Sequence, residues 1–223
     1  MQTVLVTGAN RGIGLALVQR FRERGDRVIA ACRNSSAELD ATGAQVEAGV
    51  DVADDAAVAD LARRLDGQRL DVVVLNAGVL SPQSYGDIDP AGFQSMRDQF
   101  EVNALGPLRV LQALDGCLGK GTKVGIITSR MGSMEDNTSG GHYGYRASKA
   151  AVNAIGRSLA VDLKDRGIAV QLLHPGYVAT EMVGGRGEVQ PEQAAAQLVE
   201  RLDELDLATT GSFRHANGSA LPW

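Results

Sequence analysis

Tyr145 and Lys149 are two residues whose types and spacing could do acid–base chemistry. They lie four residues apart in a segment with helical periodicity, so both side chains point to the same side of one helix. A phenol with its ordinary pKa near ~10 is a weak catalyst at neutral pH, but a neighbouring ammonium favours the phenolate and lowers that pKa. The pair is therefore a candidate for proton transfer. Because this spacing is common in helices, a solvated lysine beside a core tyrosine is the alternative interpretation.

A glycine-rich turn near the start of the chain could bind phosphate. The segment from Thr7 to Gly14 reads TGANRGIG and lies between a β-branched run and a helical segment. Glycines let the backbone approach a pyrophosphate closely, and the free N–H groups and dipole of the following helix attract the anion. In the first strand-to-helix connection, the spacing Gly-x-x-x-Gly-x-Gly predicts dinucleotide binding. A merely tight turn is the alternative.

Arg33 bears on which dinucleotide binds. It follows the second predicted strand, at a position where NAD sites usually carry an acidic residue for the ribose 2′-hydroxyl. Arg33 and Arg11 could together form a fork around a 2′-phosphate, because guanidinium groups are planar and have several donors. We therefore predict that NADP(H) is favoured over NAD(H). In the alternative interpretation, Arg33 is simply exposed to solvent.

Alternating strands and helices must position these residues. Short β-branched runs predict strands at residues 3–6, 27–31, 45–49, 71–75, 123–128 and 168–173. Helical periodicity predicts helices at residues 13–24, 54–65, 91–114, 143–165 and 191–205. This alternation predicts an α/β fold, a single-domain doubly wound (Rossmann) parallel sheet over residues 1–223 with helices on both faces. Ligands of such sheets bind beyond the carboxyl ends of the strands.

The predicted helix that contains Tyr145 has an apolar residue at every fourth position. We expect this stripe to pack on the sheet. The stripe consists of Ala147, Ala151, Ile155, Leu159 and Leu163.

The polar loop at residues 132–144, directly before Tyr145, is long for a compact fold and is typical of functional loops.

Composition argues against several other classes of protein. The 223 residues fit one large domain, and 44% apolar with 22% charged residues is ordinary for a globular protein. A net charge of −5 without a basic block argues against a nucleic-acid partner. No secretory signal and no apolar run of about 18 residues is present, so we expect a cytoplasmic protein without a membrane partner. Two cysteines and three scattered histidines predict neither a disulfide framework nor a metal site.

The chain carries an ordered set of short motifs over nearly its whole length. They are the turn from Thr7 to Gly14, Asp51-Val52, Asn76-Ala77-Gly78, Asn103, Ser129, Tyr145 with Lys149, and Pro175-Gly176 with Thr180. These motifs resemble those of the short-chain dehydrogenase/reductase family. Residues 137–141 (NTSGG), 143–149 (YGYRASK) and 221–223 (LPW) are similar to its small carbonyl-reductase branch, which includes sniffer-like and C-factor-like proteins.

The resemblance implies a cofactor site. Asp51 would contact the adenine, Asn76 and Gly78 would line the cofactor channel, and Thr180 would hold the carboxamide. The implied cofactor-binding residues are Gly8, Asn10, Arg11, Gly12, Ile13, Gly14, Arg33, Asp51, Val52, Asn76, Ala77, Gly78, Tyr145, Lys149, Pro175, Gly176, Val178 and Thr180.

The resemblance also implies a catalytic set of Asn103, Ser129, Tyr145 and Lys149. Tyr145 would protonate the alkoxide that forms on hydride transfer, and Ser129 would donate a hydrogen bond to the same oxygen. Lys149 would lower the pKa of Tyr145 and bind the nicotinamide ribose, and Asn103 would hold a relay water. Ser129 and Tyr145 are sixteen positions apart, which is wider than the commoner family spacing, so Ser133 is an alternative catalytic serine.

These inferences predict an NADPH-dependent oxidoreductase that reduces a small-molecule aldehyde or ketone to an alcohol. Candidate substrate contacts are Met131, Tyr177 and Met182, whose character indicates a hydrophobic or aromatic substrate; ordinary packing is the alternative. His142 is either a loop cap or a substrate contact. A nucleotide-binding signalling or regulatory protein of C-factor type is the alternative function.

The resemblance leads to two further expectations about shape and assembly. The chain after Thr180 reaches the helix predicted at residues 191–205 quickly, so we expect a shallow, open substrate site. Related proteins assemble through their long helices, which implies a homodimer or homotetramer.

Overall fold

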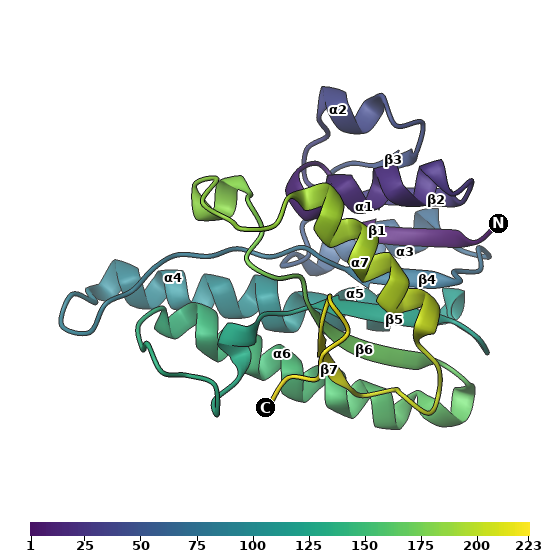
Figure 1. Cartoon of the computed structure of the whole chain (residues 1–223). Helices are drawn as coiled ribbons and strands as arrows, with labels where there is room; N and C mark the ends of the chain where they lie inside the picture. The colour runs from purple at the N-terminus through teal and green to yellow at the C-terminus, as the bar shows by residue number, and fades with distance from the viewer.

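Seven parallel strands form one sheet at the centre of the computed structural model, which describes all 223 residues (Figure 1). They are β1 (Thr3–Thr7), β2 (Arg27–Ala31), β3 (Gln45–Glu47), β4 (Val72–Leu75), β5 (Lys123–Ile127), β6 (Ala169–His174) and β7 (Phe213–His215). Their order is β3-β2-β1-β4-β5-β6-β7, so the chain builds outward from β1 in one direction and from β4 in the other. The predicted α/β fold is confirmed. Its topological switch point, where ligands of such sheets bind, lies between β1 and β4.

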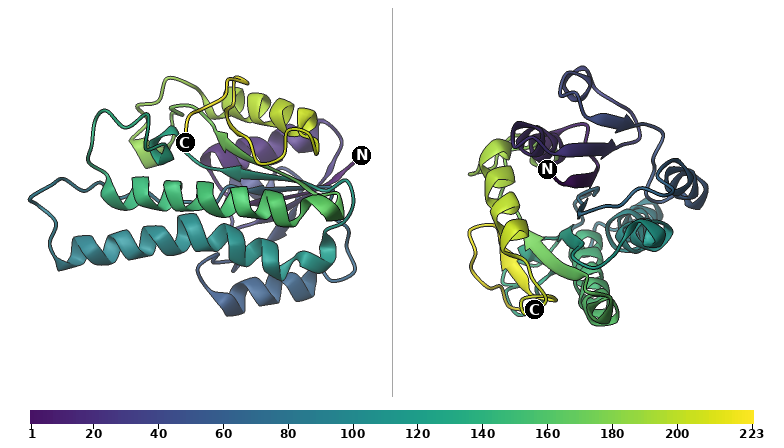
Figure 2. Two further views of the ribbon diagram at one scale, coloured as in Figure 1. Left: turned by 90° about the horizontal axis from the view of Figure 1, so that it is seen from below. Right: turned by 90° about the vertical axis from the view of Figure 1, so that its right-hand side faces the viewer.

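Helices cover both faces of the sheet, as predicted. They are α1 (Gly12–Glu23), α2 (Ala37–Asp40), α3 (Asp55–Arg64), α4 (Pro90–Phe100), α5 (Gly106–Ala113), α6 (Tyr143–Asp162) and α7 (Pro191–Glu204). Figure 2 shows α1 and α7 on one face, and α3, α5 and α6 on the other. α4 runs alongside α6. None of the helices combines the length and the apolar composition needed to cross a membrane.

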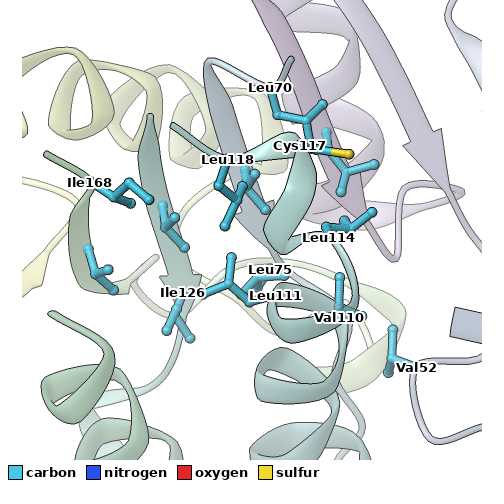
Figure 3. Close-up of a cluster of buried hydrophobic side chains, with 14 of the residues drawn as sticks. Val52, Leu70, Leu75, Val110, Leu111, Leu114, Cys117, Leu118, Ile126 and Ile168 are labelled. Carbon is cyan, nitrogen blue, oxygen red and sulfur yellow. The ribbon is translucent and has the colours of Figure 1, made fainter. Parts of the chain in front are cut away.

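Alternate residues of the central strands point to opposite faces of the sheet and belong to two hydrophobic cores. In β4, Val73 and Leu75 belong to the core beneath α3, α5 and α6, whereas Val72 and Val74 belong to the core beneath α1 and α7. Figure 3 shows part of the first core, including Leu75 and, from the neighbouring strand, Ile126. Burial on both faces is the expected pattern for a parallel sheet. This packing holds the carboxyl ends of β4 and β5, from which two of the candidate site segments continue.

The helix predicted at residues 91–114 is interrupted by a π-helical turn at Glu101–Leu105. There the N–H of Gly106 donates to a carbonyl oxygen five residues back. Pro107 explains the interruption, because it has no N–H with which to continue the α-helical hydrogen bonds. The prediction of one uninterrupted helix is wrong. Asn103 lies in the irregular turn, a placement that is frequent at functional sites.

The side of α6 that faces the sheet differs from the predicted apolar stripe. Ala147 is exposed, Ala151, Ile155 and Leu159 are partly buried and pack against the core, and Leu163 is buried within it. A stripe at every fourth position drifts around a helix that has 3.6 residues per turn, and the buried face carries polar and small side chains that an apolar pattern does not register. That face consists of Gly144, Tyr145, Ser148, Lys149, Val152, Asn153, Gly156 and Ala160.

Two short elements, α2 and β7, are absent from the prediction. α2 has four residues and β7 has three, which is too few for periodicity to indicate them. β7 extends the sheet beside β6. After β7 the chain turns back, and the ring of Trp223 lies with its centroid 5.5 Å from that of Phe213.

Candidate active site

Most of the residues implied to bind a cofactor lie at the carboxyl edge of the sheet. Apart from Tyr145 and Lys149, which belong to α6, each group follows a strand, and parallel strands end at the same edge. The fold therefore gathers segments that are far apart in the sequence. Gly8 to Gly14 follow β1, Arg33 follows β2, Asp51 and Val52 follow β3, Asn76 to Gly78 follow β4, and Pro175 to Thr180 follow β6.

The glycine-rich turn after β1 has the geometry of an anion-binding cradle. Gly8 and Gly12 have positive φ angles of 64° and 54°, which favour glycine. A Cβ at Gly14 would clash with the carbonyl oxygen of Gly8, so the turn closes tightly only with glycine there. α1 begins after Arg11 with no side-chain cap and no acidic residue in its first turn, which leaves its N–H groups and dipole for an anion. The turn therefore fits the phosphates of a dinucleotide.

The two arginines predicted to hold a 2′-phosphate have separate carboxylate partners in this structure. Arg11 lies 2.5 Å from Glu181, which directly follows Thr180, and Arg33 lies 3.9 Å from Asp51. The predicted fork of two guanidinium groups is therefore not preformed. Both pairs are exposed to solvent, where such ion pairs contribute only about 0–1 kcal/mol to stability.

Ser129 and Tyr145 are brought together by the end of β5 and the start of α6. Ser129 lies two residues after β5, and Tyr145 is the third residue of α6. Both side chains are buried, and the hydroxyl of Ser129 lies close enough to that of Tyr145 to act on its pKa. The oxygen of Ser129 also accepts a hydrogen bond from the N–H of Met131 at 3.1 Å, which fixes its direction. The structure thus places one serine beside the candidate proton donor.

Lys149 lies one helical turn beyond Tyr145 on the same buried face. Its Nζ is 5.7 Å from the centroid of the tyrosine ring. The ammonium donates one hydrogen bond, 2.9 Å long, to the carbonyl oxygen of Ile127. An ammonium has three N–H donors, so two remain for a ligand.

Burial controls the pKa values of both groups. It raises the pKa of Tyr145 to about 12, although the hydrogen bond with Ser129 acts in the opposite direction. It lowers the pKa of Lys149 to about 8, because a buried ammonium has lost its hydration. The sequence predicts that Lys149 lowers the pKa of Tyr145, but in this structure desolvation of the phenol outweighs any such effect. Tyr145 is consequently in its protonated form at neutral pH.

Asn103 joins two segments that border the site. Its Nδ2 donates to the carbonyl oxygen of Val79 at 2.8 Å and to the hydroxyl of Ser148 at 3.0 Å, while its Oδ1 accepts from the N–H of Val79 at 2.8 Å. Both amide donors and one acceptor position are therefore occupied. Within the side chain, the second lone pair of Oδ1 is left for the relay water that the resemblance implies.

Ser133, the alternative catalytic serine, has a different set of partners. Its buried hydroxyl donates to the backbone oxygen of Trp223 at 3.1 Å and accepts from the N–H of Asp136 at 3.1 Å. The N–H groups of Met134 and Glu135 donate to the same oxygen of Trp223. Through these contacts Ser133 helps to hold the loop at residues 132–144. Because its hydroxyl is used in this way, the contacts favour Ser129 as the catalytic serine.

A short segment that follows Thr180 borders the side of the site where we expect the substrate. A Cβ at Gly12 would lie 3.2 Å from Cγ2 of Thr180, so Thr180 sits directly on the glycine-rich turn. A 3-10 turn at Glu181–Val183 follows, and the chain then returns towards α7. Tyr177 and Met182 are 47% and 44% exposed, which leaves them accessible to a substrate. The shallow, open substrate site stays a prediction.

Gln83 is a buried polar residue near Tyr145 that sequence reasoning missed. Its Oε1 accepts a hydrogen bond from the N–H of Gly144 at 3.0 Å, within the first turn of α6. Its backbone oxygen accepts from the N–H of His142 at 2.9 Å. Gly144 is 61 residues further along the chain, and no motif marks Gln83, so a local pattern could not have indicated this contact.

The family model described as short chain dehydrogenase matches residues 2–207. The chain belongs to the short-chain dehydrogenase family. It is 46% identical to 1-hydroxy-2-glutathionyl-2-methyl-3-butene dehydrogenase of Rhodococcus sp. (strain AD45), with both chains covered completely. It is 40% identical to C-signal of Myxococcus xanthus over 69% of this chain and 93% of that one. This short-chain dehydrogenase is accordingly an oxidoreductase by family.

Solved carbonyl reductases share its whole fold. Carbonyl reductase Sniffer of D. melanogaster superposes with a TM-score of 0.90 at 27% identity, and both chains are covered completely. A carbonyl reductase from Pseudomonas aeruginosa PAO1 in complex with NADP has a TM-score of 0.87 at 32% identity, again over the full length of both chains. The predicted resemblance to the carbonyl-reductase branch is confirmed.

Proposed function

We propose that this short-chain dehydrogenase reduces an aldehyde or ketone to the alcohol with NADPH. The bound reduced cofactor would supply a hydride to the carbonyl carbon. Tyr145 would protonate the developing alkoxide, and Ser129 would stabilise the same oxygen by donating a hydrogen bond. The observation that carries the proposal is the buried contact between these two hydroxyl groups, one helical turn from Lys149.

The electrostatics of the site suit the reduction direction. Reduction needs a protonated phenol, and burial keeps Tyr145 protonated. The two N–H donors that Lys149 does not use within the protein would bind the ribose of the cofactor. A Cβ at Gly78 would lie 3.2 Å from Oδ1 of Asn103 and 3.7 Å from Nζ of Lys149, so the backbone of the β4 turn runs beside both groups. A water on the free lone pair of Asn103 would connect Lys149 to solvent.

The preference for NADPH is supported by the charge at the end of β2. Arg33 stands where an acidic residue would favour NAD, and the carboxylates now paired with Arg33 and Arg11 are exposed. A 2′-phosphate could replace these weak partners at little cost. The NADP complex of the structurally similar Pseudomonas carbonyl reductase agrees with this preference. We assign the remaining implied cofactor residues to the same groove.

Two substrate classes fit the available observations. Exposed Tyr177 and Met182 at a shallow opening favour a hydrophobic or aromatic carbonyl compound. The name of the relative from Rhodococcus favours, as a second candidate, an alcohol that carries a glutathionyl group and would be oxidised at the same residues by transfer of its hydride to NAD(P)⁺. In that direction Tyr145 would act as the base.

We also propose that the protein is a homodimer or homotetramer. The outer sides of α4 and α6 carry the exposed apolar side chains Phe93, Phe100 and Val161, which a partner subunit could cover. Size-exclusion chromatography with light scattering would measure the molecular mass of the protein in solution. A strictly monomeric mass would contradict this proposal.

A regulatory protein that binds the nucleotide without turnover is the second candidate function. The 40% identity to C-signal favours it. The buried catalytic set opposes it, because a sensor has no chemical need for a proton donor beside an ammonium. The two functions differ in one measurable property, which is consumption of the cofactor.

The decisive experiment is a substrate screen that includes a Tyr145→Phe variant. The wild-type protein is incubated with NADPH and aliphatic, aromatic and dicarbonyl compounds, and with NADP⁺ or NAD⁺ and a hydroxyalkyl conjugate of glutathione. We expect turnover of at least one class, and a loss of about 100-fold or more in Tyr145→Phe without loss of NADPH binding. Nearly full activity of Tyr145→Phe would disprove the mechanism. Tight NADPH binding without any turnover would favour the regulatory function.

A further inference from the structure

The catalytic helix α6 has no N-cap of its own. His142 precedes it with φ 50° and ψ 41°, and is the one non-glycine residue in the chain with a positive φ. Its side chain makes no capping hydrogen bond, and the first turn of α6 contains no acidic residue. The first N–H groups of a helix need acceptors from elsewhere. Because Tyr145 belongs to this first turn, its position depends on what caps the helix.

Gln83 supplies the missing cap from a distant segment. It bonds to both sides of the helix start, through Oε1 to the N–H of Gly144 and through its backbone oxygen to the N–H of His142. Its side chain is buried, with only 8% of the residue exposed. The strained left-handed conformation of His142 turns the loop so that both N–H groups can reach this one residue.

A row of buried amides holds Gln83 in place. Gln83 belongs to a segment without helix or strand, residues 79–83, that continues directly from the turn after β4. Asn103 binds the segment at Val79, and Oε1 of Gln99 accepts from the N–H of Ser81 at 3.0 Å. Both of these amides are 1% exposed. The segment therefore connects the cofactor edge rigidly to the start of α6.

We infer that Gln83 is a positioning residue that sets the first turn of α6 and thereby the hydroxyl of Tyr145. The inference rests on the proposed function for its effect on turnover. Its structural part, the capping of α6, stands independently. Gln83 has no polar contact with Ser129, Tyr145 or Lys149, so it acts through the helix backbone.

Two substitutions separate capping from simple packing. Gln83→Met keeps a side chain of similar length but removes the acceptor, whereas Gln83→Glu keeps an oxygen that can accept from Gly144. We expect Gln83→Met to lower kcat about 10- to 100-fold, as small displacements of catalytic groups do, with the KM for NADPH within about twofold of wild type. We expect Gln83→Glu to retain kcat within about threefold, because a carboxylate is also favoured at a helix N-terminus.

Amide hydrogen exchange tests the cap without any activity. Exchange of the peptide at residues 143–149 should be faster in Gln83→Met and close to wild type in Gln83→Glu. Asp54→Ala is the matched control, because Asp54 caps α3 through the N–H groups of Ala56 and Ala57 and makes no hydrogen bond to α6. It should lower stability by a comparable amount without changing kcat.

Each outcome decides one of the two claims. Unchanged amide exchange at residues 143–149 in Gln83→Met would show that Gln83 does not cap α6. The positioning role would be overturned if Gln83→Glu or Asp54→Ala lowered kcat as much as Gln83→Met does. It would also be overturned if Gln83→Met raised the KM for NADPH by as large a factor as it lowers kcat. If the wild-type protein turns over no substrate, the proposed function fails, while hydrogen exchange still decides whether Gln83 caps α6.

Discussion

At the scale of single residues, one physical cause shifts two pKa values in opposite directions. Burial disfavours the charged form of each group, so the pKa of Tyr145 rises and that of Lys149 falls. The protein therefore holds a neutral phenol beside an ammonium that is easier to deprotonate than a free lysine. This combination suits an acid catalyst that works while Lys149 keeps its charge.

The pH dependence of the reduction follows from these shifts. Lys149, with its pKa lowered to about 8, loses its proton as the pH rises through that value. Tyr145, with its pKa raised to about 12, stays protonated over the same range. We therefore expect kcat/KM for carbonyl reduction to be highest below about pH 8 and to fall above it. A profile of kcat/KM against pH that stays level up to pH 10 would contradict this prediction.

Substitution of each serine in turn should distinguish their roles. Ser129→Ala removes the hydrogen bond to the reacting oxygen, so we expect kcat to fall by about 100-fold or more. Ser133→Ala removes a bond that holds the loop to Trp223, so we expect a loss of about 1 kcal/mol in unfolding free energy and little change in kcat. Steady-state kinetics and denaturant unfolding of both variants measure these effects. The reverse pattern would make Ser133 the catalytic serine.

At the scale of the elements, the packing of α6 against α4 is set by a glycine. A Cβ at Gly144 would lie 2.7 Å from Nε2 of Gln99 and 2.9 Å from Cα of Met96. Because one of these atoms belongs to the backbone of α4, the two helices would have to separate. The close approach keeps the start of α6, and with it Tyr145, near the buried amides of Gln99 and Asn103.

Gly144→Ala should therefore be destabilising although it favours the helical conformation. Helix propensity alone would favour alanine by about 1 kcal/mol, whereas overpacking costs about 1–3 kcal/mol. We expect a net loss in unfolding free energy together with a lower kcat. Gly116→Ala is the control, because a Cβ there meets nothing within 4 Å. A Gly144→Ala variant as stable and active as wild type would show that the two helices can adjust.

At the scale of the whole molecule, the proposed cofactor groove lies where the two halves of the sheet meet. Asn76, after β4, donates from Nδ2 to the carbonyl oxygens of Thr7, the last residue of β1, and Gly8 at 3.0 and 3.1 Å. A Cβ at Gly8 would lie 2.8 Å from Cα of Ala77, so the two turns are in direct contact. A ligand in this groove would contact both halves of the sheet and should stabilise the entire fold.

Thermal unfolding with each cofactor measures that stabilisation and the cofactor preference together. A ligand at 100 times its Kd raises the unfolding free energy by about 2.7 kcal/mol. We expect a larger rise in Tm with NADPH than with NADH at equal concentration. Arg33→Ala should reduce the effect of NADPH and leave that of NADH unchanged, because only NADPH has the 2′-phosphate. An equal response to both cofactors in the wild-type protein would contradict the preference for NADPH.

Much of the fold and the location of the site follow from the sequence alone. Alternating strand and helix periodicities predict the parallel sheet, and motifs such as Thr7 to Gly14 and Asn76 to Gly78 can be assigned to its carboxyl edge. These features are local, since each depends on residue types and spacing within a few turns of chain. Pro107, which interrupts the helix predicted at residues 91–114, is also a local feature of the sequence.

Only the tertiary structure decided the surroundings of the catalytic groups. The pKa shift of Tyr145 has the opposite sign to the predicted one, because desolvation depends on every segment packed around the ring. The partner of Ser133 lies 90 residues away at Trp223, and the cap of α6 comes from Gln83, 61 residues before Gly144. Hydrogen bonds and burial between such distant residues form only when the chain is folded, so no local pattern could determine them.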